Sequence, residues 1–129
     1  MLLYLSTNTR LNIAFAVSQV CRFTSAPKKS HASAVKMILR YLKGTMNQGM
    51  IIMPTRNKLE MNLFVNADFC GLFGQENPQD PAAAKSWTGY IITLGGWPLV
   101  WKSTLQDQTA QSTTEAFAIV FWFVFMMFW

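Results

Sequence analysis

The chain has 129 residues, of which 51% are hydrophobic and 13% are charged. This length allows one domain, or one small domain with a piece of another. The composition is globular, and the charged share is about half the usual one, so few charges protect the surface against association. Length and composition therefore exclude several complete domains and indicate a small globular chain that associates easily.

The formal net charge of +5 is concentrated in the first half of the chain. Residues 1–60 hold nine of the eleven Lys and Arg and a single acid, Glu60, whereas residues 61–129 carry more acids than bases. A basic half is typical of a protein that binds a polyanion. A basic face that is simply solvated is the alternative.

The cysteines and the N-terminus bear on the cellular compartment. Cys21 and Cys70 show no CxxC or metal-ligand spacing, which fits a reduced intracellular chain. The apolar start, Met1 to Leu5, lacks a basic region and a long apolar core, so it does not resemble a signal peptide. We therefore expect an intracellular protein, in the cytoplasm or the nucleus.

The first part of the chain is predicted to be helical. Apolar residues recur at helical spacing over residues 9–24, and Pro27 ends the pattern. A second helix is predicted over residues 31–43, with Ser30 as its N-cap and Gly44 as the residue just beyond its end. Its apolar face consists of Val35, Ile38, Leu39 and Leu42.

The second helix also carries the best candidates for contacts with nucleic acid. Lys36, Arg40 and Lys43 follow one another at i, i+4 and i+7, so they share one helix face. Lys85 and Lys102 are further candidates. The lone histidine, His31, has no apparent nucleophile or acid partner, so we expect it to pack or to cap the helix.

From residue 48 the pattern becomes that of strands. The runs 50–53 and 63–65 are apolar, and Pro54, Asn57 and Lys58 lie between them as in a turn between strands. A second sequence signal is the Gly-Gly pair at residues 95 and 96, which is typical of a hairpin turn.

These signals predict a three-stranded antiparallel sheet, with strands at about 60–68, 87–95 and 97–103. Residues 71–86 are rich in Gly, Pro, Asn and Gln and predict a loop between the first two strands. The sheet is expected to be covered by a terminal helix.

The C-terminal segment from Ala116 to Trp129 contains no charged residue. Its 14 residues are too few to span a membrane, which requires about 17–25. No Lys or Arg flanks the run to fix an orientation. Three interpretations remain open: a buried helix cut off by truncation, a frameshifted or non-coding tail, and a membrane-inserted tail. The segment is also expected to promote aggregation.

Several short blocks follow one another in a fixed order along the chain. They are Ile38–Thr45, Asn66–Gly71, Lys85–Tyr90, Trp101–Ser103 and Ser112–Phe117. Together they resemble copia-type retrotransposon polyproteins, over roughly residues 1–117. The first block and the residues before it resemble the segment that follows the reverse-transcriptase palm, and the others resemble the start of the RNase H domain. The family usually has Pro-Asp where this chain has Leu11-Asn12.

The resemblance implies hydrolysis of the RNA strand of an RNA–DNA hybrid by two Mg²⁺ ions held by about four carboxylates. Where the family has a metal-binding Asp and Glu, this chain has Asn66 and Phe117, a neutral amide and a side chain that cannot bind Mg²⁺. Asp68 and Glu115 are the remaining nearby acids, either as weak ligands or as a strand-end acid and a helix-start acid. The two later family acids have no counterpart. We therefore predict no metal, no other cofactor and no hydrolytic activity.

The predicted fold class is α/β. A helical segment, residues 1–47, precedes an incomplete RNase H-like domain, residues 48–129, with an antiparallel sheet and a C-terminal apolar helix. The expected function is that of a degenerate fragment of a copia-type polyprotein. The alternatives are a non-catalytic basic module that binds RNA, DNA or their hybrid, and a small membrane-associated protein held by residues 116–129. No small-molecule substrate is evident.

Overall fold

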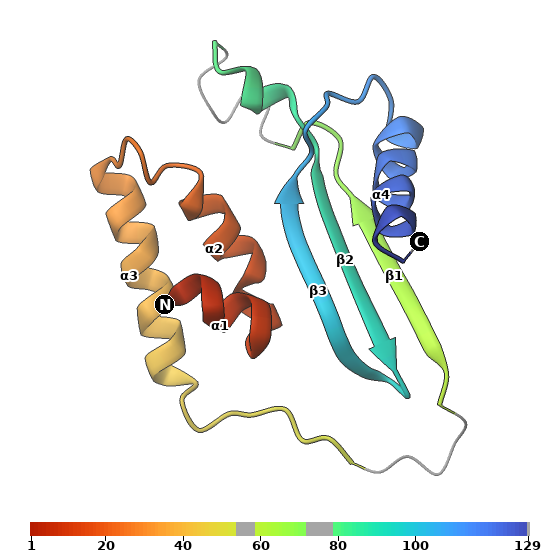
Figure 1. Ribbon diagram of the computed structural model, residues 1–129. Coiled ribbons are helices and arrows are strands. Elements are labelled where there is room, and N and C mark those ends of the chain that lie inside the picture. The colour runs from red at the N-terminus through yellow and green to blue at the C-terminus, as the bar shows by residue number, and fades with distance from the viewer. Residues whose placement is uncertain (54–58, 72–78, 129) are drawn as a thin grey trace. The chain divides into compact units, whose positions relative to one another are not determined.

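The computed structural model describes residues 1–53, 59–71 and 79–128, and its contacts divide the chain into two compact units, Met1–Lys58 and Leu59–Trp129 (Figure 1). The first unit is helical and the second contains a sheet and a helix. The predicted mixture of helices with a three-stranded antiparallel sheet is therefore confirmed. The predicted division after residue 47 falls within the first compact unit, which extends to Lys58.

Three helices build the first unit. They are α1 (Leu2–Asn8), α2 (Ala14–Cys21) and α3 (Lys29–Gly44), with a short 3-10 helix, η1 (Leu11–Ile13), before α2. The buried centre of the unit is formed by Ile13, Val17 and Ile38. Apolar side chains at helical spacing on α2 and α3 therefore meet in one small core, as the sequence pattern predicts.

The predicted helix over residues 9–24 is wrong in its first part, because α2 begins only at Ala14, after η1, and a separate helix, α1, ends before it at Asn8. The side chains of Thr7 and Asn8 donate hydrogen bonds of 2.9 Å to the backbone carbonyls of Leu3 and Tyr4. Such bonds give the backbone an alternative to the helical ladder. Arg10 then leaves the helical region, with φ −130° and ψ 74°.

The start of α3 differs from the prediction by two residues. Lys28, and not Ser30, is the N-cap, and its N–H donates to Nδ1 of His31 at 3.1 Å. The His31 ring also stacks on Phe23, with ring centroids 4.1 Å apart. His31 therefore caps and packs, as predicted. Gly44 is the last residue of α3, not the residue beyond its end.

A cation closes the other end of α3. Nη2 of Arg10 donates to the carbonyl oxygen of Thr45, the C-cap residue, at 2.9 Å. The last carbonyls of a helix have no partner within the helix and carry partial negative charge. The guanidinium group therefore ties the segment after α1 to the end of α3.

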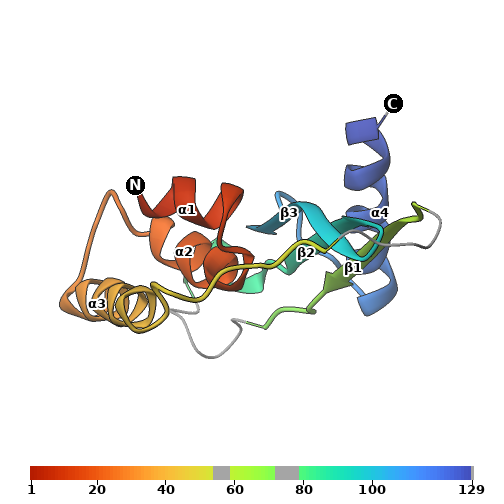
Figure 2. The same ribbon diagram turned by 90° about the horizontal axis from the view of Figure 1, so that it is seen from below.

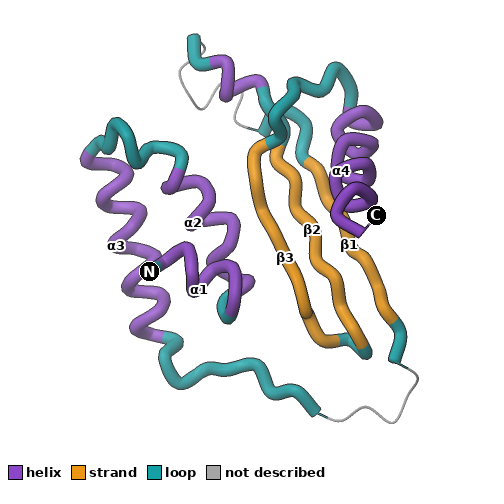
Figure 3. Tube along the Cα trace, viewed as in Figure 1, coloured by secondary structure: helices purple, strands orange, loops and turns teal. Residues whose placement is uncertain are grey.

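The second unit contains the sheet, in the order β1 (Met61–Ala67), β2 (Trp87–Leu94), β3 (Trp97–Leu105), with both pairs antiparallel (Figure 3). Gly95 and Gly96 connect β2 to β3 with φ values of 59° and 88°, which glycine adopts without steric cost. The three predicted strands and the predicted hairpin turn are confirmed.

The apolar run 50–53 forms no strand, so that prediction is wrong. Its side chains are exposed, and an extended run becomes a strand only when a neighbour pairs its backbone. The predicted turn at Pro54, Asn57 and Lys58 lies outside the described residues, as does much of the predicted loop 71–86. The described end of that loop contains a short 3-10 helix, η2 (Pro81–Ala84).

The C-terminal segment forms α4 (Thr113–Phe128), which packs on one face of the sheet, as predicted (Figure 2). Successive strand residues point to opposite faces. The packed face carries Val65 and Ala67 of β1, Tyr90 and Ile92 of β2, and beneath them Val120 and Val124 of α4. Within the described part of the chain, no helix has the length and apolarity to cross a membrane.

We predict that Arg10→Ala destabilises the first unit by about 1.5 kcal/mol, because a charge-assisted hydrogen bond to a helix end is lost. Hydrogen–deuterium exchange of the α3 amides in the full chain measures the effect. Arg40→Ala, which removes an exposed arginine from the same helix, should leave that exchange nearly unchanged. Equal exchange in the two variants would contradict the role of Arg10.

Candidate functional site

The two positions at which the resemblance places metal ligands lie on different elements of the second unit. Asn66 is in β1, opposite Gly89 of β2. Because Val65 and Ala67 face α4, the Asn66 side chain projects from the other face of the sheet. Phe117 is near the start of α4 and is 37% exposed. The structure therefore does not bring these two side chains together.

Asp68 follows β1 directly and ties its end to the start of β2. Its N–H donates to the Trp87 carbonyl oxygen at 3.2 Å, and its Oδ1 accepts a hydrogen bond from the Trp87 N–H. Its other oxygen lies against Gly71, where a Cβ atom would come within 2.0 Å of Oδ2. Asp68 therefore acts as a strand-end acid, and any larger residue at position 71 would displace its carboxylate.

The turn after Asp68 is held by a second set of bonds. Cys70 has a positive φ of 51°, which is uncommon for a residue other than glycine. Its N–H donates to Oγ of Ser86 at 3.4 Å, and its Sγ donates to the Ala84 carbonyl oxygen at 3.2 Å. The cysteine thus has a structural part in connecting this turn to the residues before β2.

Glu115 occupies the first turn of α4. Its Oε2 accepts a hydrogen bond from the Gln111 N–H at 2.7 Å, and its own N–H donates to Oγ of Ser112 at 3.1 Å. The Ser112 hydroxyl thus satisfies a free N–H group of the helix start, while the Glu115 carboxylate holds the residue before the cap and lies where negative charge is favourable. Glu115 is therefore a helix-start acid.

These four positions do not fit a centre for two magnesium ions. Asn66 offers one neutral oxygen and Phe117 offers none, while the carboxylates of Asp68 and Glu115 already accept backbone hydrogen bonds. Magnesium prefers several oxygen ligands, most of them charged, in octahedral geometry. Across residues 1–53, 59–71 and 79–128, no three or more His, Cys, Asp or Glu side chains are grouped to hold a metal.

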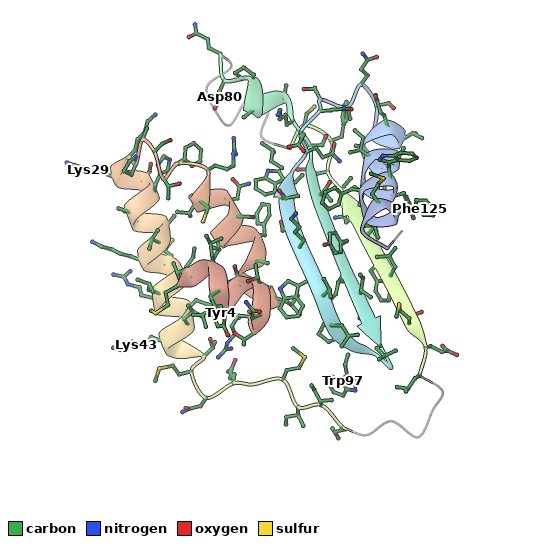
Figure 4. The ribbon with its side chains drawn as sticks, in the orientation of Figure 1. Tyr4, Lys29, Lys43, Asp80, Trp97 and Phe125 are labelled. Atoms are coloured by element: carbon green, nitrogen blue, oxygen red, sulfur yellow. The ribbon has the colours of Figure 1, made fainter. Side chains whose placement is uncertain are left out.

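The basic residues of α3 lie on one face of the helix. Lys36, Arg40 and Lys43 are exposed, and Lys29 extends this face towards the start of the helix. On a helix that turns about 100° per residue, these four lie within about 60° of one another. Figure 4 shows Lys29 and Lys43 near the two ends of α3. We call these four residues the α3 basic stripe.

The stripe lies opposite the buried face of α3. Ile38 is about 180° from Lys29 around the helix and is buried. Leu39, which was predicted for the apolar face, lies about 100° from Ile38 and is 47% exposed. The apolar face of α3 is therefore narrower than predicted.

Lys85 and Lys102, the other predicted nucleic-acid contacts, belong to the second unit. Nζ of Lys102 lies 4.8 Å from the centre of the Phe123 ring of α4, a cation–π arrangement. Lys102 pairs with Tyr90 across the sheet, and burial raises the pKa of the Tyr90 phenol above its usual value. Lys85 follows η2, and its N–H donates to the Ala82 carbonyl oxygen at 3.2 Å.

Gln106 is a buried residue that the sequence pattern did not single out, since a lone glutamine after a strand carries no periodic signal. It is 4% exposed, and its Nε2 donates to Oγ1 of Thr88 and to the carbonyl oxygen of Ala116, both at 3.0 Å. Its backbone N–H donates to the Ser86 carbonyl oxygen at 2.9 Å. One side chain therefore connects the end of β3 to β2 and α4.

A groove of about 790 Å³ lies between β3 and α4. Its lining includes Thr104 and Leu105 from β3 and Ile119, Trp122 and Met126 from α4. β3 and the terminal helix were both expected from the sequence, but the space between them was not. The groove also identifies the flank of α4 that faces β3.

Known proteins are similar in sequence to this chain. The chain is 37% identical over 108 residues to the retrovirus-related Pol polyprotein from transposon RE1 of Arabidopsis thaliana, which is 84% of this chain. It is 40% identical over 115 residues, 89% of this chain, to the Pol polyprotein from transposon TNT 1-94 of Nicotiana tabacum. It is 32% identical to the secreted RxLR effector protein 161 of Plasmopara viticola, over 88% of this chain and 74% of that protein.

This chain is homologous to a segment of retrovirus-related Pol polyproteins from plant transposons. It spans only 7% and 8% of the two plant transposon Pol polyproteins. The predicted relationship to a retrotransposon Pol polyprotein is confirmed at this level. No family model matches the Pol-related chain, and no solved structure matches it.

We predict that Asp68→Ala destabilises the second unit of this Pol-related chain by about 2 kcal/mol, because it removes the charge-assisted bond to the Trp87 N–H. Urea unfolding monitored by tryptophan fluorescence measures the change. Asp107→Ala removes an exposed acid from the same unit and serves as the control. An Asp68→Ala midpoint equal to that of the control would contradict the strand-end role.

Proposed function

We propose that this chain derives from the reverse-transcriptase and RNase H region of a copia-type Pol polyprotein and no longer hydrolyses RNA in RNA–DNA hybrids. The order of the sequence blocks supports the first part. Asn66–Gly71 spans the end of β1 and the turn after it, and Lys85–Tyr90 enters β2. Trp101–Ser103 lies in β3, and Ser112–Phe117 starts α4. The blocks that carry the resemblance in the second unit thus fall in or next to β1, β2, β3 and α4, in chain order.

The proposed loss of activity rests on the hydrogen bonds that the two remaining acids, Asp68 and Glu115, already make. Asp68 closes the turn onto β2, and the Glu115 carboxylate holds the Gln111 N–H just before α4. Each carboxylate is held by a backbone N–H, so diverting it to a metal would cost the bond that it makes. Asn66 and Phe117 stand where the family has its ligands and supply no charge.

We predict that neither the natural chain nor the Asn66→Asp, Phe117→Glu double variant cleaves an RNA–DNA hybrid in Mg²⁺ or Mn²⁺. The two restored carboxylates would project from β1 and α4 on different faces of the sheet, too far apart to share a pair of cations. A fluorescent-hybrid cleavage assay, with an active RNase H as positive control, measures this.

Binding of Mn²⁺, followed by electron paramagnetic resonance, is the second readout for the same proteins. We expect no tight Mn²⁺ site in either. Metal-dependent cleavage by the natural chain would overturn the proposed loss of activity. Cleavage by the double variant alone would show that the two substitutions by themselves account for it, and that the geometry described for β1 and α4 is wrong.

A second candidate function is binding of a nucleic-acid strand by the first unit without cleavage. Residues 1–58 contain nine Lys or Arg and no Asp or Glu. The α3 basic stripe runs about 21 Å along the helix, at about 1.5 Å per residue. A line of exposed cations with no acid nearby in sequence is suited to successive phosphates of one strand.

We predict that replacing Lys36, Arg40 and Lys43 together by Ala lowers the salt dependence of single-stranded RNA binding. About 0.7 of a counterion is released per phosphate contact on single strands, so the slope of log K against log salt should fall by about 2. Fluorescence anisotropy from about 50 to 200 mM salt measures the slope.

The matched control keeps the charges and exchanges their types, as Lys36→Arg, Arg40→Lys and Lys43→Arg. Its slope should equal that of the natural chain, since phosphate neutralisation depends on charge. No binding by the natural chain at about 50 mM salt would exclude this function, because phosphate contacts are strongest there.

A further inference from the structure

β1 is an edge strand of the sheet, with one side unpaired among the described residues. The Gly95 N–H donates to the Glu60 carbonyl, and the Asp68 N–H donates to the Trp87 carbonyl. Antiparallel pairing alternates along a strand, so the even-numbered residues of β1 direct their backbone groups to β2. The backbone N–H and C=O groups of Met61, Leu63, Val65 and Ala67 therefore point outwards.

The two edges of the sheet differ in how they are protected. The β1 sequence, Met-Asn-Leu-Phe-Val-Asn-Ala, contains no charge and no proline. β3, at the other edge, contains Pro98 and Lys102, and its pairing with β2 is interrupted by a register shift at Ile92 and Thr93. Charges, prolines and irregular pairing are the usual devices that stop edge strands from pairing with other chains. β1 has none of these devices.

An apolar stripe of α4 lies on the same side of the unit. Val120 and Val124 face the sheet, and the flank with Trp122 and Met126 lines the groove towards β3. The opposite flank carries Phe117, Phe121 and Phe125, which are 37%, 56% and 61% exposed. Figure 4 shows Phe125 on the side of α4 away from β3. We call these three residues the α4 phenylalanine stripe.

We propose that the free edge of β1 and the α4 phenylalanine stripe together form a docking surface for a second copy of this chain. The two copies pair β1 with β1 in antiparallel fashion about a two-fold axis. The inference does not depend on the proposed loss of activity or on nucleic-acid binding. Neither β1 nor the α4 phenylalanine stripe carries a charge, so no like charges face one another when two copies pair through these surfaces.

The backbone of β1 fits this symmetry. Phe64 is the central residue of the seven, and its backbone groups point to β2. An axis at Phe64 therefore makes the two Phe64 residues a non-hydrogen-bonded pair, with Cβ atoms about 5 Å apart. Leu63 of one copy then exchanges hydrogen bonds with Val65 of the other, and Met61 with Ala67, so every outward group is paired.

The spacing of the helices fits as well. An axis perpendicular to the sheet keeps both copies of α4 on the same face. Each α4 packs on β1 and β2 of its own copy, so the two helices lie about two strand spacings apart, about 10 Å. Packed helices lie about 8–10 Å apart. The two phenylalanine stripes therefore meet across the axis.

The size of the surface sets the expected affinity. Phe64 is 58% exposed, and with the phenylalanine stripe it offers on the order of 400 Å² of apolar surface per copy. A stable complex usually buries about 800 Å² per partner. The edge hydrogen bonds, Met61 and Leu63 add to the contact, so we expect a dimer with a dissociation constant in the micromolar range.

Sedimentation velocity of the full chain at about 100 µM, well above a micromolar Kd, tests the proposal. The natural chain should sediment as a dimer. Phe64→Lys and Phe64→Glu should each be monomeric, because like charges would face one another at the axis. An equimolar mixture of the two variants should recover the dimer, since opposite charges then pair.

Two further variants serve as a charge control and as a separate test of the α4 phenylalanine stripe. Leu99→Lys adds the same charge to an exposed position on β3, at the other edge, and should remain dimeric. Phe121→Lys alters only the α4 phenylalanine stripe and should weaken the dimer at least tenfold. Circular dichroism shows whether each variant is folded. A monomeric natural chain, open-ended oligomers, or a Phe64→Lys variant that dimerises as well as the natural chain would overturn the proposal.

Discussion

The two-residue period of β1 is the constraint on which the second unit depends. It turns Val65 and Ala67 towards α4, where they join the core with Tyr90 and Ile92. The same alternation turns the side chains of Asn66 and Phe64 to the opposite face. It also directs the backbone groups of successive β1 residues alternately to β2 and to the free edge. A shift of one residue would exchange these roles, so the core, the site positions and the exposed edge are fixed together.

The acids of the second unit illustrate how stability and chemistry compete for the same groups. Asp68 and Glu115 both bond to backbone N–H groups at places where regular elements begin or end. Such bonds are short-range and satisfy donors that would otherwise be unpaired. In the first unit the cations serve similar ends: Arg10 closes α3, while the α3 basic stripe stays exposed. The two units therefore differ in charge as well as in architecture.

The elements with strong periodicity were predictable. The hairpin at Gly95 and Gly96 follows from a turn that needs positive φ, and α3 follows from apolar residues at helical spacing. The failures occurred where the sequence pattern was weaker. The helix predicted over residues 9–24 begins only at Ala14, because Arg10 leaves the helical region, and the apolar run 50–53 found no strand to pair with among the described residues. In the site, the substitutions at Asn66 and Phe117 were visible in the sequence, but the role of Gln106 was not.

The sequence by itself determined which residues are present: the neutral side chains of Asn66 and Phe117, the concentration of cations in residues 1–58, and the absence of charge from Met61–Ala67 and from residues 116–129. These are properties of side-chain chemistry and need no coordinates. Only the tertiary structure decided which partners those residues have. Hydrogen bonds such as that of Gln106 to Ala116, and the separation of Asn66 from Phe117, depend on how the strands pair and on which face α4 covers. Those choices are made by burial of apolar surface over the whole unit, which no local stretch of sequence contains.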